Sequence, residues 1–336
     1  MDNGPIGVYQ QFVIYVSIGR RWVSRQLDPL AHNGQWWMLP VLLGVTVGFA
    51  FVPGAGADYI NVFYHASERA YVGFYYPQWA EFLLKPFDLL PPVIAYAAFL
   101  LFQSTCLVIA TRCFGGDLRA AFLNYSALSF LFYGQMEGVV ILGLAALKWG
   151  LERDQPSVAS LGLIAALVKP QVGLPLALFF LIKKWRWEPV VSLAIVVATS
   201  LVLWPGWPSD LAQRLLSAPP DTSGNISLWQ YTGPAALLLW IPALLIPMSD
   251  SRRQVVLAAT SALGLPYFQM YSPLLLYVMP VGWWPLLGNI VFLGMIWGGR
   301  PVKALALVPA CVYLVWIAKS AREARCSLES WDRRNR

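Results

Sequence analysis

The density of long apolar runs constrains this chain more than any other feature of its sequence. Of its 336 residues, 58% are hydrophobic and only 12% are charged, and its mean hydropathy is +0.56. Soluble domains carry about 25% charged residues, and a helix needs about 20 apolar residues to cross a bilayer. The sequence therefore predicts an all-α polytopic membrane protein, a bundle of about twelve helices with little chain left for a soluble domain.

The basic residues predict the orientation of these helices. The chain has 24 Lys and Arg against 17 Asp and Glu, which gives a net charge of +7. Three quarters of the basic residues fall in alternate segments between apolar runs: Arg20, Arg21, Arg25, Arg112, Arg119, Lys148, Arg153, Lys183, Lys184, Arg186, Arg252, Arg253, Lys319, Arg322, Arg325, Arg333, Arg334 and Arg336. This positive-inside pattern places both termini in the cytoplasm, and it indicates membrane lipids rather than nucleic acid as the surroundings of the chain.

The order of runs and loops predicts one membrane domain with short ends. Residues 1–35 are expected to form a cytoplasmic, interfacial amphipathic segment. The membrane domain covers 36–318, with outer loops at about 54–90 and 205–230, and residues 319–336 form a basic cytoplasmic tail. The expected full spans are 36–53, 92–111, 189–204, 232–248 and 254–267, followed by the stretch 268–318, split at Trp283-Trp284 and Gly298-Gly299.

Two pairs of shorter apolar runs follow the second span, and each pair is interrupted by a polar tip. The runs are 119–133 and 137–150 around Gly134-Gln135, then 157–168 and 172–183 around Lys169-Pro170-Gln171. Each run is too short for an ordinary span. We expect two hairpins that enter from the cytoplasmic side, with polar tips in a cavity lined by protein or water.

An acidic residue stands at the head of an aromatic-rich outer loop. Asp58 directly follows 53–57, Pro-Gly-Ala-Gly-Ala, so it lies close to the membrane surface. An aspartate there is suited to take a proton from an attacking hydroxyl as a general base. The alternative is an ordinary solvated carboxylate. Side chains of the same loop are candidates for binding a substrate: Tyr59, Tyr64, His65 and Tyr76.

Lys169 is the candidate for binding an anion, because an ammonium between apolar runs is costly unless it is paired or functional. The alternatives are a lysine that snorkels from a helix end and a structural ion pair with Glu137. Gln171 and, at the other tip, Gln135 are candidate polar contacts to a substrate. A third polar break contains Tyr271, and it either lines the same cavity or is a simple outer turn.

Several motifs are missing from the sequence. The four cysteines show no CxxC spacing and the two histidines stand apart from any carboxylate cluster, so no disulfide or metal site is expected. The chain has no Walker A, Asp-x-Asp, HExxH or GxSxG pattern. It therefore resembles neither an ATP-driven pump nor a soluble nucleotide-sugar transferase, and no cofactor is expected.

With these features together, the first half of the membrane domain resembles glycosyltransferase family 87, a family of GT-C membrane enzymes that includes bacterial mannosyltransferases. The family pattern runs Asp-aromatic, Tyr-x-Ala, Gly-x-x-Tyr with Pro close behind, Gly-Gln, and a Gly-rich span ending in Lys-Pro. Within about 36–186 the matching residues are Asp58-Tyr59, Tyr64-His65-Ala66, Gly73-Phe74-Tyr75-Tyr76-Pro77, Gly134-Gln135 and the stretch from Gly162 to Lys169-Pro170. The chain departs from the pattern at Glu137, where the family commonly has Asn. It is also short for a member of this family.

The resemblance implies a GT-C-like bundle that transfers a sugar, by family mannose, from a polyprenyl-phosphate-sugar donor to a glycolipid or glycan acceptor. The reaction is an inverting single displacement on the extracytoplasmic side of a bacterial inner membrane. Asp58 would be the general base. The phosphate of the leaving group would be neutralised by Lys169, Arg69 and Arg214. The substrates would be contacted by Tyr59, Tyr64, His65, Tyr76, Gln135, Glu137, Gln171 and Tyr271.

Two other classes of function also fit parts of the sequence. A transporter or flippase of a lipid-linked sugar would use polar breaks in membrane helices too, although the halves 36–186 and 187–318 share no internal repeat. A non-catalytic scaffold for envelope assembly would tolerate substitution of Asp58 and gives no reason for Lys169. The enzyme is the preferred interpretation.

Overall fold

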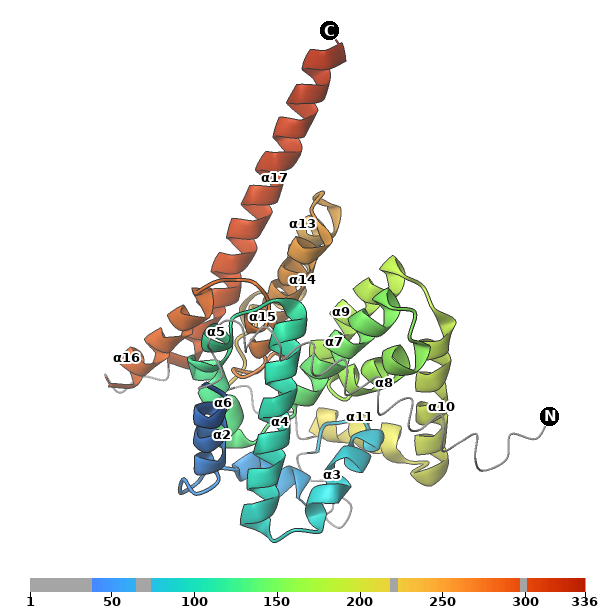
Figure 1. Cartoon of the computed structure of the whole chain (residues 1–336), viewed down its shortest axis with the longest axis vertical. Helices are drawn as coiled ribbons and strands as arrows, with labels where there is room; N and C mark the ends of the chain where they lie inside the picture. The colour runs from blue at the N-terminus through green and yellow to red at the C-terminus, as the bar shows by residue number, and fades with distance from the viewer. Residues whose placement is uncertain (1–37, 65–73, 218–222, 297–300, 336) are drawn as a thin grey trace, which may run out of the picture. The chain divides into compact units, whose positions relative to one another are not determined.

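The computed structural model describes residues 38–64, 74–217, 223–296 and 301–335 (Figure 1). Over these ranges the chain is all helical, with sixteen α-helices and no strand. The prediction of an all-α chain is confirmed, and the helix count exceeds the expected twelve because several spans are broken into short pieces. The predicted interfacial segment at 1–35 lies outside the described residues.

The chain forms a succession of α-helices and short 3-10 or π-helical turns. They are α2 (Met38–Phe49), the π-helical turn η1 (Tyr59–Phe63), η2 (Gln78–Ala80), α3 (Glu81–Asp88), α4 (Pro92–Phe114), α5 (Leu118–Phe122), α6 (Tyr125–Tyr133), α7 (Glu137–Glu152), α8 (Pro156–Ala166), α9 (Pro170–Lys183), α10 (Trp187–Leu203), α11 (Trp207–Ser217), α12 (Trp229–Thr232), η3 (Gly233–Leu239), α13 (Trp240–Leu245), α14 (Asp250–Gly264), α15 (Leu274–Tyr277), η4 (Trp284–Asn289), α16 (Ile290–Ile296), η5 (Pro301–Ala306) and α17 (Leu307–Asn335). The described residues belong almost entirely to one compact unit, Thr46–Arg336.

Proline and glycine set the helix boundaries around the predicted hairpins. Pro92, Pro156 and Pro170 each occupy the first turn of their helix, where a missing N–H costs nothing and the fixed φ suits the helix. Gly115 ends α4 and Gly134 ends α6, both in the left-handed conformation, at φ 78° and 72°. Glycine reaches this conformation without a Cβ clash. The two predicted polar tips therefore fall at true helix breaks.

Two helices are long and apolar enough to cross a membrane, at Pro92–Phe114 and Pro301–Cys326, within the described part of the chain. The number rises to four if each bent pair is one span: α6 with α7, bent by 113°, and α10 with α11, bent by 87°. At about 1.5 Å per residue, α4 would reach across a hydrocarbon core of about 30 Å. Helices of this length and composition are those expected of a membrane protein.

Two predicted segments need correction. The expected span 232–248 is instead the 3-10 turn η3 followed by the six-residue α13. Pro234 lies in the first turn of η3, and Pro242 lacks the N–H that one continuous helix through 232–248 would use. The run 119–133 is broken into α5 and α6 at Leu123-Asn124. Helix α17 continues without a break into the predicted tail 319–336, as far as Asn335.

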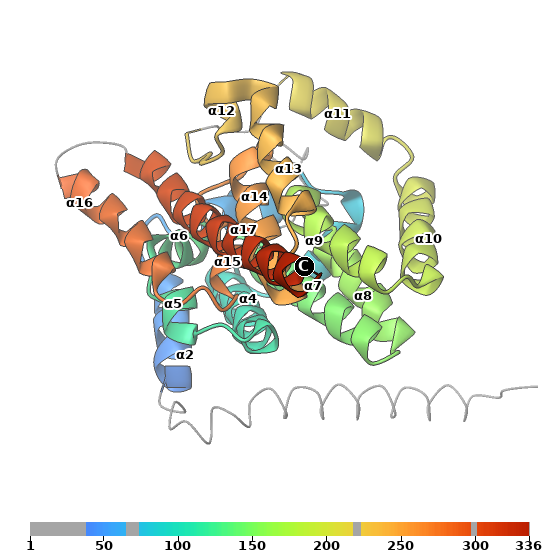
Figure 2. The ribbon, with the colours of Figure 1, turned by 90° about the horizontal axis from the view of Figure 1, so that it is seen from above.

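Helix α7 lies at the centre of the packing. It contacts α4, α8, α9 and α15, and α8 lies between α7 and α10 (Figure 2). The α7–α8 contact is close because glycines face each other: a Cβ on Gly162 would lie 2.3 Å from the amide nitrogen of Leu147, and one on Gly143 would lie 2.5 Å from that of Ala166. Small residues at such contacts let two helix backbones approach each other.

Substitution of Gly162 tests this contact. We expect Gly162→Ala to destabilise the protein by about 1–3 kcal/mol, because the new methyl group meets backbone that cannot move aside without shifting a helix. Thermal unfolding in detergent micelles measures the change. Gly48→Ala is the control, since a Cβ there has nothing within 4 Å and Ala favours a helix by about 0.5–1 kcal/mol. Equal stability of both variants would contradict the close contact.

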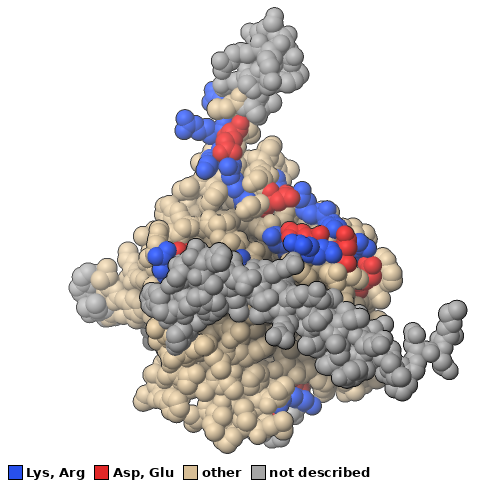
Figure 3. All heavy atoms as spheres, viewed as in Figure 1, with Lys and Arg blue, Asp and Glu red and all other residues tan. Residues whose placement is uncertain are grey.

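The charged side chains gather at one end of the helices. Figure 3 shows them over the region where α7 and α9 end and α14 begins, while most of the described surface below is uncharged. Surface ion pairs form among the charged residues at this end. Lys183 pairs with Asp250 at 2.9 Å, and both Lys184 and Arg186 pair with Asp154. A charged end beside an apolar flank is the distribution expected at a membrane–water boundary.

Candidate functional site

A cavity of about 510 Å³ lies where several helix breaks meet. Its walls come from the turn before η1, the α6–α7 break, the α8–α9 break and the segment between α14 and α15. Six of the predicted site residues line it: Asp58, Tyr76, Gln135, Lys169, Gln171 and Tyr271. Concave sites of about 300–1,000 Å³ with a few convergent polar groups are the usual form of small-ligand sites.

A tyrosine between two glycines places Asp58 next to Gln135. Gly56 and Gly134 both have positive φ, and a Cβ on either would lie within 3 Å of the Tyr96 ring, at 2.9 Å and 2.7 Å. The ring therefore packs against the turn before Asp58 and against the α6–α7 break at once. Only glycine allows this approach with that backbone conformation. The local sequence, Gly-Ala-Asp and Gly-Gln, thus fixes the spacing of the two polar side chains.

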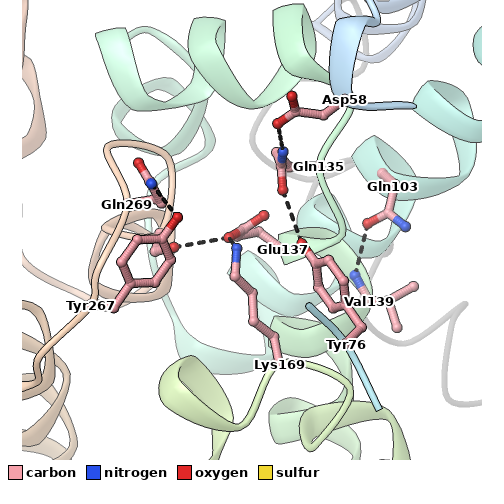
Figure 4. A network of polar contacts seen from close by, with 10 residues as sticks. Asp58, Tyr76, Gln103, Gln135, Glu137, Val139, Lys169, Tyr267 and Gln269 are labelled. Atoms are coloured by element: carbon pink, nitrogen blue, oxygen red, sulfur yellow. Dashed lines mark hydrogen bonds and ion pairs between the residues drawn. The ribbon is translucent and has the colours of Figure 1, made fainter. Parts of the chain in front are cut away.

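Asp58, Gln135 and Tyr76 form a hydrogen-bonded chain along one wall (Figure 4). The Gln135 side-chain amide donates to a carboxylate oxygen of Asp58, and the Tyr76 hydroxyl donates to the Gln135 carbonyl oxygen at 3.2 Å. Burial raises the pKa of Asp58 above its ordinary value, and the nearby charge of Glu137 adds to the rise, although Lys169 and the Gln135 hydrogen bond oppose it. A carboxyl group with a raised pKa in a cavity has the character of a general base.

Lys169 lines the same cavity and is paired with Glu137, a predicted substrate contact that lies behind it and is not among the lining residues. The side chains are only 3% and 0% exposed, and the Lys169 ammonium contacts the Oε1 atom of Glu137. Ser272 donates a hydrogen bond to the same oxygen at 2.9 Å, and the Tyr271 ring lies 4.6 Å from the ammonium. The ion pair considered from the sequence as an alternative is therefore present, and Lys169 still faces the cavity.

A second wall was only partly predicted. Tyr267 and Gln269 line the cavity, and the Gln269 amide donates to the Tyr267 hydroxyl. Gly224 leaves room for this amide, since a Cβ there would lie 2.3 Å from its carbonyl oxygen. The polar break containing Tyr271 was the sequence signal for this wall. Tyr125 and Tyr133 also line the cavity and had no signal, because a tyrosine in an apolar run looks like an ordinary core residue.

Two predicted substrate contacts have structural roles away from the cavity. Tyr59 is 1% exposed and packs on the Tyr96 ring, with centroids 5.3 Å apart. The Tyr64 hydroxyl donates to the Leu90 carbonyl at 2.8 Å. Neither residue is among those that line the cavity. The π-helical turn after Asp58 directs these two neighbours into the core.

The predicted basic partners of Lys169 are not gathered around it within the described residues. Arg214 lies on α11 and donates to the Phe74 carbonyl at 3.0 Å, outside the cavity lining. Arg69 and His65 lie in 65–73, outside the described residues. Among the residues the structure covers, no group of three or more His, Cys, Asp or Glu side chains has the arrangement of a metal site.

Comparisons of the chain with protein families, with curated proteins and with solved structures found no match.

Proposed function

We propose that this protein is a membrane glycosyltransferase that moves a sugar, with mannose the first choice, from a polyprenyl-phosphate-sugar donor to a lipid or glycan acceptor. Its placement as a multi-pass protein of a bacterial inner membrane, with the cavity toward the extracytoplasmic side, belongs to the same proposal. The observation that carries it is the convergence of Asp58 and Lys169 in one cavity whose lining also includes six tyrosines and three glutamines. Tyrosine rings offer flat faces to sugars, and amides offer paired donors and acceptors to hydroxyls.

The reaction follows from the chemistry of these groups. The Asp58 carboxylate takes the proton of the acceptor hydroxyl, whose oxygen forms a bond to the anomeric carbon of the donor sugar. The bond from that carbon to the phosphate oxygen breaks on the opposite face, so the configuration inverts and the lipid phosphate leaves with the electron pair. Lys169 stabilises the charge that develops on the leaving group.

A transfer assay tests the proposal. The full-length protein is reconstituted in liposomes with polyprenyl-phosphate-mannose labelled in the sugar, together with lipid extract as the source of acceptor. We expect label to appear in a new lipid or glycan, with an equal amount of polyprenyl phosphate formed. The rival function is a flippase, which the bent helix pairs also suit. Label that crosses the bilayer while remaining on the donor would establish the flippase instead.

The raised pKa of Asp58 predicts the pH dependence of transfer. The base must be ionised to act, so activity should be lost as the pH falls through the pKa of Asp58 in the folded protein. Because burial raises that pKa, the acid limb of the rate profile should lie above the pH at which an exposed aspartate titrates. Single-turnover rates across the acidic range measure it. A profile that is flat down to the ordinary aspartate pKa would exclude Asp58 as the base.

A further inference from the structure

The charges of the cavity raise a difficulty for an anionic ligand. Within the described residues its ionisable acids and bases are Asp58 and Lys169, and Glu137 lies directly behind Lys169. Two carboxylates against one ammonium leave the site negative. A lipid phosphate that approaches Lys169 therefore meets an ammonium that already has an anionic partner, and Coulomb repulsion from two carboxylates opposes its entry.

The surroundings of Glu137 show how this difficulty is resolved. Its Oε1 atom accepts hydrogen bonds from both the Lys169 ammonium and the Ser272 hydroxyl, whereas its Oε2 atom is buried and has no hydrogen-bond partner in the described part of the chain. Lys169 is thus the one cation in contact with this carboxylate among the described residues. If the ammonium turned to a second anion, Glu137 would remain as a buried and unpaired charge, which is strongly unfavourable. A proton on the carboxyl group removes that charge and leaves Oε1 free to keep its bond from Ser272.

We propose that Glu137 is a positioning residue, which holds Lys169 in the empty site and takes up one proton from solvent when the ammonium transfers to the phosphate of a bound lipid. The inference rests on the proposed function only for the choice of a lipid phosphate as the anion. The proton enters the Glu137 carboxyl group, the ion pair with Lys169 is exchanged for one with the phosphate, and no other bond changes. The binding of a singly charged phosphate diester is then coupled to the uptake of one proton.

The other titratable groups near Glu137 can be separated from it. Asp58 faces it from the turn before η1, Tyr76 from the segment before η2, Tyr271 from the segment before α15, and Lys169 from the start of α9. Burial raises the pKa of both tyrosines well above the ordinary value, so they stay neutral near neutral pH. From α4, the neutral Gln103 bonds to the Val139 amide beside Glu137. Among the described residues, Asp58 is the remaining group that could take up a proton, and the Asp58→Asn variant removes it.

The test is a calorimetric titration of full-length Asp58→Asn in micelles with farnesyl methyl phosphate, a singly charged diester, and with uncharged farnesol. A diester is needed because the second ionisation of a phosphate monoester falls near pH 6. Repeating the titration in buffers of different ionisation enthalpy counts the protons. We expect an uptake of about one proton per diester at neutral pH, and affinity that rises up to about tenfold for each unit by which the pH falls.

Three further variants, each combined with Asp58→Asn, sharpen the result. Glu137→Gln should bind the diester at least about tenfold more tightly at neutral pH than the parent, without proton uptake. Lys169→Gln should lose the preference for the diester over farnesol. Glu81→Gln is the matched control, because this glutamate is also buried, at 1% exposed, but its partners are Gln78 at 2.7 Å and Lys85 rather than Lys169. It should keep the proton uptake of the parent.

Diester binding without proton uptake by the Asp58→Asn protein would overturn the inference, and so would a Glu137→Gln variant that binds as weakly as Lys169→Gln. Absence of diester binding would overturn it as well. These outcomes do not depend on sugar transfer. Proton-coupled diester binding together with a negative transfer assay would keep the inference and remove the proposed enzyme.

Discussion

Asp58→Asn is expected to lower sugar transfer at least about 100-fold, because general bases contribute about 10²–10⁴ to rate and an amide cannot take the proton of the acceptor hydroxyl. The amide is nearly isosteric with the carboxyl group, so the cavity wall formed with Gln135 and Tyr76 should keep its shape. The measurement is the initial rate of transfer in proteoliposomes with matched amounts of folded protein.

The same substitution should leave stability unchanged or raise it. Burial raises the pKa of Asp58 in the folded protein, so between the unfolded and the folded pKa the folded state holds more protons than the unfolded chain. Stability therefore falls as the pH rises through that window, and an uncharged side chain escapes this loss. Thermal unfolding of wild type and Asp58→Asn at neutral pH measures the difference. A large loss of stability would mean that lost activity reflects unfolding.

Asp210→Asn is the matched control for this experiment. It makes the same chemical change at an exposed residue of α11, in the other predicted outer loop, so both activity and stability should remain near wild type. Transfer that survives Asp58→Asn would place the base elsewhere in the chain. The comparison of the two variants therefore distinguishes two roles of Asp58: a general base, and an ordinary carboxylate outside the apolar runs.

The helix breaks were predictable from sequence because single residues cause them. Pro92, Pro156 and Pro170 start helices and Gly134 ends one, and these residue types have few other uses in an apolar run. Long stretches without such residues were harder to divide. The basic end of α17 has no breaker between the apolar part and Asn335, so the helix continues where the charge pattern changes.

The site was predicted where polarity conflicted with its surroundings and missed where it did not. Gln135, Lys169 and Tyr271 interrupt apolar runs, and all three line the cavity. Tyr59 was chosen by its position next to Asp58, but the π-helical turn buries it against the Tyr96 ring. The local backbone conformation decides whether two neighbours in sequence share a face, and hydropathy does not report that conformation.

The pairing of Lys169 with Glu137 illustrates the same limit. The two residues are 32 positions apart, and each begins or caps a different helix, α7 or α9. Sequence alone left open whether Lys169 snorkels, binds an anion or pairs with Glu137. The packing of α9 against α7 brings Lys169 and Glu137 into contact, so the ion pair forms. Because Lys169 also lines the cavity, it could bind an anion there by the proposed exchange of partners.

The second large effect is expected from breaking this pair. Lys169→Met should lower the free energy of unfolding by about 3–5 kcal/mol, because it leaves the fully buried Glu137 carboxylate without its cation. Glu137→Gln added to Lys169→Met should recover most of the loss, since two neutral side chains need no partner of opposite charge. Denaturation of both single variants and the double variant in micelles gives the coupling energy as a double-mutant cycle.

The exposed pair of Lys184 and Asp154 supplies the control, with side chains 42% and 57% exposed. Lys184→Met should cost less than about 1 kcal/mol, because the carboxylate of Asp154 is solvated by water and keeps its ion pair with Arg186. A loss in Lys169→Met no larger than in Lys184→Met would show that Glu137 is already neutral in the folded protein. The loss should also shrink as the pH falls, because a proton on the lone Glu137 removes the buried charge. That protonated carboxyl group is the one that partner exchange requires when a phosphate takes Lys169, so the stability of Lys169→Met at low pH reports on the same chemistry without any ligand.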